Sequence, residues 1–370
     1  MTQGRLTSLD VFRGATIAAM ILVNDPGGPG TYGPLEHAAW NGWTPTDLVF
    51  PFFLFIVGVA MAFSFPVRLQ RGETRQNLLL HVVWRGVILF ALGLFLNGLP
   101  IGFDLASWRV YGVLQRIAIC YVITAIIALR AQPRTWLPAA LACLAGYWIL
   151  LRFVPVPGYG LPTHDMPLLD PDRNLVAWLD RKLLAGHLYE VTRDSEGLLS
   201  SIPAVASCLF GLVAGHWLRS LRTAGRKVCG LVICGCAGVV LGEMWNVWFP
   251  INKKLWTSSY VILTTGFALL ALAFCYWLMD IKQRRGPFST FFQVFGSNAI
   301  AAYVLAELLA ISLDMVPVSR DMSLHDFVHQ RLFVPIADAP NSSLLYAIAF
   351  TLACWIPMWL LYRKQIFLKI

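Results

Sequence analysis

The sequence predicts an all-α membrane protein: a polytopic helix bundle of about ten transmembrane helices that forms a single domain over residues 1–370. Two observations support this class. Of the 370 residues, 57% are hydrophobic and only 13% are charged, whereas soluble domains carry about 25% charged residues. The mean hydropathy is +0.63, and the apolar residues gather in runs long enough to cross a bilayer, about 17–25 residues. A water-soluble enzyme and a disordered chain are both excluded.

Ten apolar runs follow one another along the chain, and each predicts one span. The first contains Asp10 and Arg13 and has no small-residue cleavage site after it, so we interpret it as an uncleaved span. The runs are Leu9–Asn24, Asp47–Pro66, Leu78–Asn97, Val110–Leu129, Trp136–Phe153, Leu199–Leu218, Val228–Phe249, Trp256–Met279, Phe288–Leu313 and Leu344–Tyr362.

The basic residues predict the orientation. With the N-terminus inside, more of the 29 Lys and Arg fall in inner connections than in outer ones, which places both termini in the cytoplasm. The net charge of +9 comes from these short clusters and not from one patch, so no nucleic-acid partner is expected. The eight cysteines lie in apolar runs and are expected to be buried hydrophobes, with no metal site.

Two outer connections are more than linkers. Residues 25–46 contain no Lys or Arg and are rich in Gly, Pro and aromatics, and residues 152–198 are too long for a turn. We expect both loops to fold over the outer mouth of an active site. The chain shows no internal repeat, which weakens an interpretation as an inverted-repeat transporter.

Three arginines lie inside predicted spans. A charge at the bilayer centre costs about 2.5–3.5 kcal/mol, so Arg13, Arg85 and Arg116 must be paired, hydrated or snorkelling. Snorkelling fits Arg13 best, because it is close to the inner boundary. Arg116 is near the middle of its span, where snorkelling is harder. The three arginines together indicate that they line a polar cavity.

The first outer loop ends in a helix-start pattern. Thr44, Pro45 and Asp47 are typical of an N-cap, a first-turn proline and a carboxylate at the third position. His37 precedes this start, where the helix dipole favours a neutral imidazole that can accept a proton. His37 is therefore either an ordinary loop histidine or a general base.

Three other polar segments have both structural and functional interpretations. Glu196 lies at the start of the sixth span. It is either a helix-start carboxylate or a hydrogen-bond acceptor for a polar substrate. Asn252 and Trp256 enter the eighth span among interfacial aromatics. Asn298 places an amide inside the ninth run, for helix packing or for a ligand.

Several motifs together resemble the heparan-α-glucosaminide N-acetyltransferase family, in family order over nearly the whole chain. The opening Leu9-Asp10-Val11-Phe12-Arg13-Gly14 also resembles that of transmembrane acyltransferases more broadly. The other motifs are the Asn24 turn, His37-Ala38-Ala39-Trp40-Asn41-Gly42, Asp47-Leu48-Val49-Phe50, Gly112-Val113-Leu114-Gln115-Arg116, Glu196-Gly197-Leu198-Leu199, Asn252-Lys253-Lys254-Leu255-Trp256 and Gly296-Ser297-Asn298.

The resemblance implies acetyl transfer from cytoplasmic acetyl-CoA to an amino sugar on the far side of the membrane. It maps the active-site histidine onto His37 and its partner onto Asn24, and we group Asp47 with them as catalytic. The donor is expected at Arg13, Arg85, Arg116 and Asn298, where guanidinium groups suit phosphates. The acceptor is expected at Glu196, Asn41, Trp40, Asn252 and Trp256.

The chain starts at the family's first motif, so it is expected to be a bacterial inner-membrane member that acts on glucosamine or a cell-wall sugar. The expected partners are acetyl-CoA, the amino-sugar acceptor, membrane lipid and, as one option, a second copy in a homodimer. The alternatives are a sugar transporter, which ten spans and buried charge would also fit, and a non-catalytic scaffold. The sequence does not distinguish N- from O-acetylation, nor a ternary complex from an acetyl-histidine relay.

Overall fold

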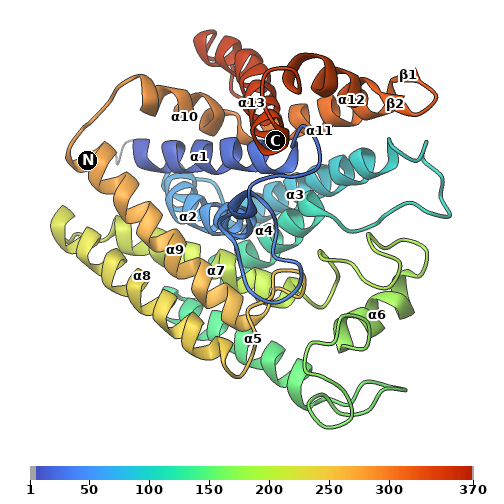
Figure 1. Ribbon diagram of the computed structural model, residues 1–370. Coiled ribbons are helices and arrows are strands. Elements are labelled where there is room, and N and C mark those ends of the chain that lie inside the picture. Colours follow the sequence, from blue (N-terminus) through green and yellow to red (C-terminus); the bar gives the residue numbers. More distant parts are fainter. Residues whose placement is uncertain (1–5, 369–370) are drawn as a thin grey trace. The chain divides into compact units, whose positions relative to one another are not determined.

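The structure is a computed structural model that describes residues Leu6–Leu368, and its regular secondary structure over these residues is almost entirely helical (Figure 1). The all-α prediction is confirmed. The strands of the described part form one short antiparallel hairpin, β1 (Pro317–Ser319) and β2 (Met322–Ser323). Arg5 and Lys369, two of the cations counted as cytoplasmic, lie outside the described residues.

All ten predicted runs are helical. Within the described residues, eight helices are long and apolar enough to cross a membrane, so the chain is a multi-pass membrane protein. They are α2 (Val49–Gln70), α3 (Arg75–Gly98), α4 (Val113–Arg130), α5 (Pro133–Phe153), α7 (Ser201–Arg219), α8 (Ala224–Asn246), α9 (Ser258–Tyr276) and α13 (Ala339–Arg363). The first run is α1 (Thr7–Asn24), a largely buried helix that is not among these eight.

The ninth run is helical but broken, which the sequence did not predict. It consists of α10 (Pro287–Ser297) and α11 (Ala299–Met315), whose axes are bent by 81°. The break falls at Asn298, which has a non-helical backbone (φ −130°, ψ 43°). Its amide Nδ2 donates to the Ile366 carbonyl at 3.1 Å, and its Oδ1 accepts from the Leu368 amide at 2.8 Å. The side chain thus binds the C-terminal segment at the bend, and the pair counts as at most one further span.

The described chain divides into two compact units. Unit 1 comprises Met1–His37, Thr44–Phe50 and Ala271–Ile370, as far as these ranges are described, and unit 2 comprises Ala38–Trp43 and Pro51–Leu270. The chain therefore passes from unit 1 to unit 2 immediately after His37 and returns before Thr44.

Unit 1 is built on a close contact between α1 and α10, which lie side by side in Figure 1. A Cβ atom on Gly14 would lie 1.7 Å from the Phe292 carbonyl oxygen, and one on Gly296 would lie 1.9 Å from the Asp10 carbonyl oxygen. Only glycine allows this backbone-to-backbone approach, as is usual for small residues between membrane helices. Helix α13 packs against both α1 and α10.

Unit 2 packs in the same way around α7, which contacts α4 and α5. A Cβ atom on Gly58 of α2 would lie 1.9 Å from the Cys208 carbonyl oxygen, and one on Gly211 would lie 1.9 Å from the Phe55 carbonyl oxygen. Cys229, Cys234 and Cys236 of α8 are exposed, so the expectation that all cysteines are buried is wrong for these three. Most of α8 faces outward in the described structure, where an apolar helix meets lipid.

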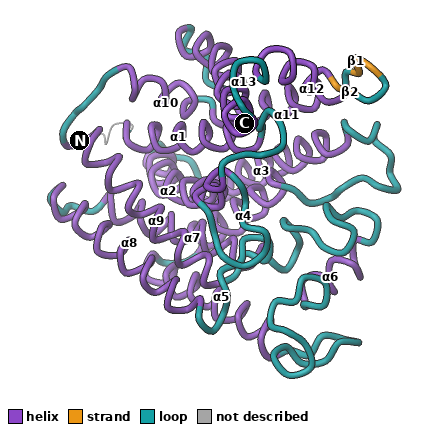
Figure 2. The backbone as a smooth tube through the Cα atoms, in the orientation of Figure 1, coloured by secondary structure: helices purple, strands orange, loops and turns teal. Residues whose placement is uncertain are grey.

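The two long connections contain local structure (Figure 2). Residues 25–48 hold the 3₁₀ turns η1 (Gly33–Leu35) and η2 (Pro45–Leu48). The connection between α5 and α7 holds α6 (Leu175–Leu184), whose N-cap Asn174 accepts from the Ala177 amide at 2.9 Å. The segment after β2 forms α12 (Leu324–Val328) and the π-helical turn η4 (His329–Phe333), while a second π-helical turn, η3 (Trp277–Ile281), ends α9. That the first two loops cover an active-site mouth stays a prediction.

Candidate active site

A histidine–carboxylate pair is present in unit 1 at the predicted helix start. Thr44 is the N-cap of η2, Pro45 follows it, and Asp47 completes a capping box. The Asp47 Oδ2 atom accepts from the Thr44 amide at 3.0 Å, and its Oδ1 lies 2.8 Å from His37 Nδ1. The predicted capping role of Asp47 is confirmed, and the same carboxylate also holds His37.

The two partners differ in exposure, and this determines what the pair can do. The Asp47 side chain is completely buried, whereas that of His37 is 48% exposed. A buried carboxylate beside Nδ1 favours the tautomer that carries its proton there, which leaves the Nε2 lone pair as the proton acceptor. The pair is therefore arranged as a base and its orienting group.

Asn24 is the last residue of α1, and its side chain is exposed. The turn after it is held by α13, because the Gly27 amide donates to the Ser343 carbonyl at 3.3 Å and the Gly28 amide donates to Ser343 Oγ at 3.4 Å. Asp25, at the C-cap of α1, is half-buried. Burial, with the nearby charges of Glu307 and Asp314, raises the pKa of Asp25 to about 8.

Arg13, a predicted donor residue, lies near the bend of unit 1 that contains Asn298. Arg13 Nη1 donates to the Gly296 carbonyl at 3.1 Å and lies 3.7 Å from the Asp10 carboxylate. Gly296 is two residues before Asn298, at the bend between α10 and α11. The ion pair and the partly exposed side chain agree with the expectation that Arg13 snorkels and is paired.

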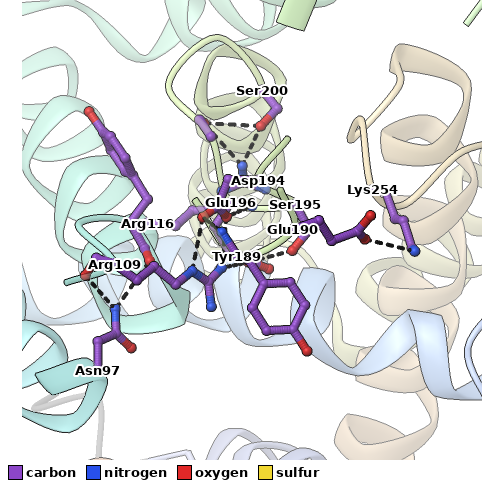
Figure 3. Close-up of polar contacts among 12 residues, drawn as sticks. Asn97, Arg109, Arg116, Tyr189, Glu190, Asp194, Ser195, Glu196, Ser200 and Lys254 are labelled. Atoms are coloured by element: carbon purple, nitrogen blue, oxygen red, sulfur yellow. Dashed lines mark hydrogen bonds and ion pairs between the residues drawn. The ribbon is translucent and has the colours of Figure 1, made fainter. Parts of the chain in front are cut away.

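Unit 2 contains a buried ionic cluster that the sequence did not reveal (Figure 3). Arg109 binds Asp194 through two hydrogen bonds of 2.9 and 2.7 Å, and its Nη2 also donates to Glu196 Oε2 at 2.5 Å. Ser195 Oγ donates to the same Glu196 oxygen at 2.5 Å. Burial raises the pKa of Glu196, but the charges of Arg109 and Arg116 outweigh it and hold the pKa below its usual range. Glu196 is thus an ionised, paired carboxylate.

Arg109 and Asp194 are 85 residues apart, and each looks like an ordinary loop charge in the sequence. Nothing in their spacing along the sequence indicates that the two side chains are in contact. The one available signal is the Glu196 motif itself, because a buried carboxylate requires a cation or donors nearby.

Arg116 lies beside this cluster and is completely buried. Its Nη2 donates to the Gly197 carbonyl at 3.3 Å and to Ser200 Oγ, and its guanidinium carbon lies 4.9 Å from the centre of the Trp256 ring. Its Nε and Nη1 atoms have no hydrogen-bond partner among the described residues. Trp256 has φ +53°, a left-handed conformation that is uncommon for a bulky residue, so its ring is held in place at some cost in backbone strain.

Asp180 of α6 is a second carboxylate that the sequence did not single out. It is completely buried, and its Oδ1 accepts from the Leu198 amide at 3.4 Å. A Cβ atom on Gly197 would lie 2.3 Å from Asp180 Oδ2, which explains the glycine after Glu196. Burial, together with the charge of Asp194, raises the pKa of Asp180 to about 6.

The predicted acceptor residues Trp40, Asn41 and Asn252 lie together in unit 2. Asn252 Nδ2 donates to Asn41 Oδ1 at 3.1 Å, and the Trp40 indole Nε1 donates to the Leu169 carbonyl at 2.9 Å. The Arg193 guanidinium lies 5.0 Å from the centre of the Trp40 ring. These contacts fasten the short segment that follows His37.

Arg85, the remaining predicted donor residue, lies on α3. Its guanidinium is 5.4 Å from the centre of the Tyr121 ring, and its buried Nε has no hydrogen-bond partner among the described residues. No group of three or more His, Cys, Asp and Glu in the described structure is arranged to hold a metal ion.

The fold and these sites define a multi-pass membrane protein with a histidine–carboxylate pair in a connecting loop and arginines within its helices. A family model described as heparan-alpha-glucosaminide N-acetyltransferase, catalytic, matches residues 5–230, which is more than half of the chain. The chain belongs to this family of acyltransferases. The matched range includes His37, Asp47, Arg116 and Glu196, whereas Asn252, Trp256 and Asn298 follow it.

Two curated relatives carry the same name, heparan-alpha-glucosaminide N-acetyltransferase. The human protein is 30% identical over 420 residues, which cover 99% of this chain and 60% of the human protein. The mouse protein is 31% identical over 358 residues, which cover 82% of this chain and 54% of the mouse protein. The chain therefore spans little more than half the length of the relatives it matches.

Proposed function

We propose that this chain is a transmembrane acetyltransferase that moves the acetyl group of cytoplasmic acetyl-CoA to an amino sugar at the opposite face of the membrane. The observation that carries the proposal is the pair of His37 with the fully buried Asp47, at 2.8 Å. Membership of an N-acetyltransferase family supports the reaction type.

His37 acts as general base in this reaction. Its Nε2 atom takes a proton from the acceptor amine as the amine nitrogen attacks the thioester carbonyl carbon. The carbon–sulfur bond then breaks, and the proton passes to the departing thiolate of coenzyme A. Asp47 holds the tautomer, and Asn24 holds the acceptor or the thioester carbonyl. A positioned base contributes roughly 10²–10⁴-fold to the rate.

The donor is bound by arginines and an asparagine. Arg13 and Arg85 take the phosphates, since a guanidinium offers a planar fork of donors to a phosphate group. Arg116 and Asn298 complete the donor set. The acceptor set is Glu196, Asn41, Trp40, Asn252 and Trp256, where Trp40 and Asn252 act by fastening the loop that carries Asn41.

We place the enzyme in a bacterial inner membrane, with a glucosamine or cell-wall-type sugar as acceptor and with lipid around the helices. A homodimer is compatible with this assignment. The experiment that tests the function uses purified protein in detergent with radiolabelled acetyl-CoA and a panel of amino sugars. The enzyme labels at least one sugar without any gradient, whereas a sugar transporter would label none.

Direct transfer in a ternary complex is the route that we favour. An acetyl-imidazole on the half-exposed His37 would be open to hydrolysis, whereas a bound thioester loses its acyl group more slowly. Direct transfer gives intersecting lines in two-substrate plots and no labelled protein without acceptor. A stoichiometric burst of coenzyme A from enzyme and donor alone, lost in His37→Ala, would establish the relay instead.

A further inference from the structure

Arg116 is the most unusual buried group in the described structure. It is completely buried, yet only its Nη2 atom is engaged, by the Gly197 carbonyl and by Ser200. The Nε and Nη1 atoms keep N–H groups that meet no acceptor among the described residues. A buried cation with unsatisfied donors is costly, and such groups in native proteins usually have a partner. The missing partner is an acceptor from outside the chain.

The charges around Arg116 limit what that acceptor can be. The charge of Arg116 acts on both Glu196 and Asp180, and Arg109 is already bound to Asp194 and Glu196 (Figure 3). With two arginines and three carboxylates, the cluster needs no further negative charge. A phosphate, which brings at least one full negative charge, would be repelled by the carboxylates in a region of low dielectric constant.

An uncharged oxygen atom is a suitable hydrogen-bond acceptor for the Nε and Nη1 groups of Arg116. The Trp256 ring covers one face of the guanidinium, and its indole Nε1 donates to Ser207 Oγ at 3.3 Å. An approaching group can therefore use the in-plane N–H groups but not that face. A carbonyl oxygen accepts such hydrogen bonds without adding charge, and a hydrogen bond to a charged donor is worth more than one between neutral groups.

We propose that Arg116 binds a carbonyl oxygen of the acyl-pantetheine arm of the donor, rather than its phosphates. The inference rests on the proposed function and divides the donor residues into two sets. Arg13 and Arg85 meet the nucleotide phosphates, and Arg116 meets the arm that carries the acetyl group. Arg116 is thus a residue that determines specificity for the acyl arm.

The test compares two donors, acetyl-CoA and S-acetylpantetheine, which lacks the nucleotide and all of its phosphates. For Arg116→Gln, kcat/KM should fall by roughly 10–100-fold with both donors, the loss expected for a hydrogen bond to a charged group. Arg13→Gln is the matched control, and its loss should appear with acetyl-CoA and vanish with S-acetylpantetheine. Arg116→Lys retains the charge and one donor group, so it should recover part of the loss and serves if the glutamine variant does not fold.

Three results would overturn the inference. A loss in Arg116→Gln that disappears with S-acetylpantetheine would assign Arg116 to the phosphates. A change confined to the KM of the sugar would assign it to the acceptor. Unchanged kinetics in a folded Arg116→Gln variant would mean that Arg116 binds buried water and not the donor. Calorimetric binding of both donors to the wild type separates this inference from the function, because donor binding without sugar acetylation would contradict the reaction and not the contact.

Discussion

The His37–Asp47 pair of unit 1 and the arginine cluster of unit 2 both bury carboxylates in connecting loops, but with different partners. Asp47 is paired with a half-exposed imidazole, which offers its second ring nitrogen as a proton acceptor. Asp194 and Glu196 are paired with Arg109, which keeps its charge at any ordinary pH. The first arrangement can move a proton, whereas the second holds its loop in place and fixes the position of Glu196.

The same comparison explains how the two regions depend on the fold. The His37 pair is formed within 11 consecutive residues, His37 to Asp47, by a local turn. The Arg109 cluster joins the segment before α4 to the segment before α7 and exists only in the folded chain. Changes at His37 should therefore act on catalysis, and changes at Arg109 should act on stability.

The largest expected effect is on turnover in His37→Ala. Removal of the base should lower kcat by about 10²–10⁴-fold while the midpoint of thermal unfolding stays close to that of the wild type. Steady-state acetyl transfer together with a thermal unfolding scan measures both. More than about a tenth of the wild-type rate in a folded variant would show that His37 is not the base.

Arg109→Met should have the opposite profile. It leaves Asp194 and Glu196 buried without their cation, which typically costs 3–5 kcal/mol of stability. The free energy of unfolding in detergent should fall by about that amount. Arg109→Lys is the matched control and should recover part of it. Loss of activity at full stability would place Arg109 in the catalytic machinery and break the contrast between the two regions.

Asp180 gives a pH-dependent test within the second region. Because folding raises its pKa from 3.8 to about 6, the folded state holds the proton more tightly than the unfolded state does. Its contribution to stability is therefore complete below pH 3.8 and is lost as pH rises through about 6. At about 1.36 kcal/mol per pKa unit, this pKa shift lowers the free energy of unfolding by about 3 kcal/mol at high pH.

Asp180→Asn removes this penalty. The variant should be more stable than the wild type at pH 7.5 and similar to it at pH 4, as measured by unfolding at both values. A variant that is equally destabilised at both pH values would show that the carboxylate contributes through its hydrogen bonds to the loop and not through its charge.

The smallest effect is expected at the helix start that holds Asp47. Thr44→Ala removes an N-cap, which typically costs about 1 kcal/mol. It keeps the backbone amide that binds Asp47, so turnover should change only a few-fold. Thr44→Ser is the control and should behave like the wild type. A loss of activity as large as that of His37→Ala would mean that the cap also takes part in the reaction.

The sequence predicts the parts of this molecule that depend on local pattern. The ten helical runs, the capping role of Asp47 and the position of His37 before that helix start follow from hydropathy and spacing, whereas the contact between the two residues was not predicted. The bend at Asn298 could not be predicted, because it depends on an amide that binds Ile366 and Leu368 some 70 residues later. Arg109 and Asp180 were missed for the same reason, since their partners are distant in the sequence.

The central claim is that Asp47 orients His37 as the base for acetyl transfer, and the pH dependence of kcat/KM tests it most directly. In the wild type, kcat/KM should rise with pH through one acid limb and then reach a plateau. In Asp47→Asn the plateau should fall, because the imidazole is no longer held in the tautomer that presents Nε2 as the proton acceptor. In His37→Ala the limb should be absent. An unchanged limb in folded His37→Ala, or an unchanged plateau in folded Asp47→Asn, would contradict the account.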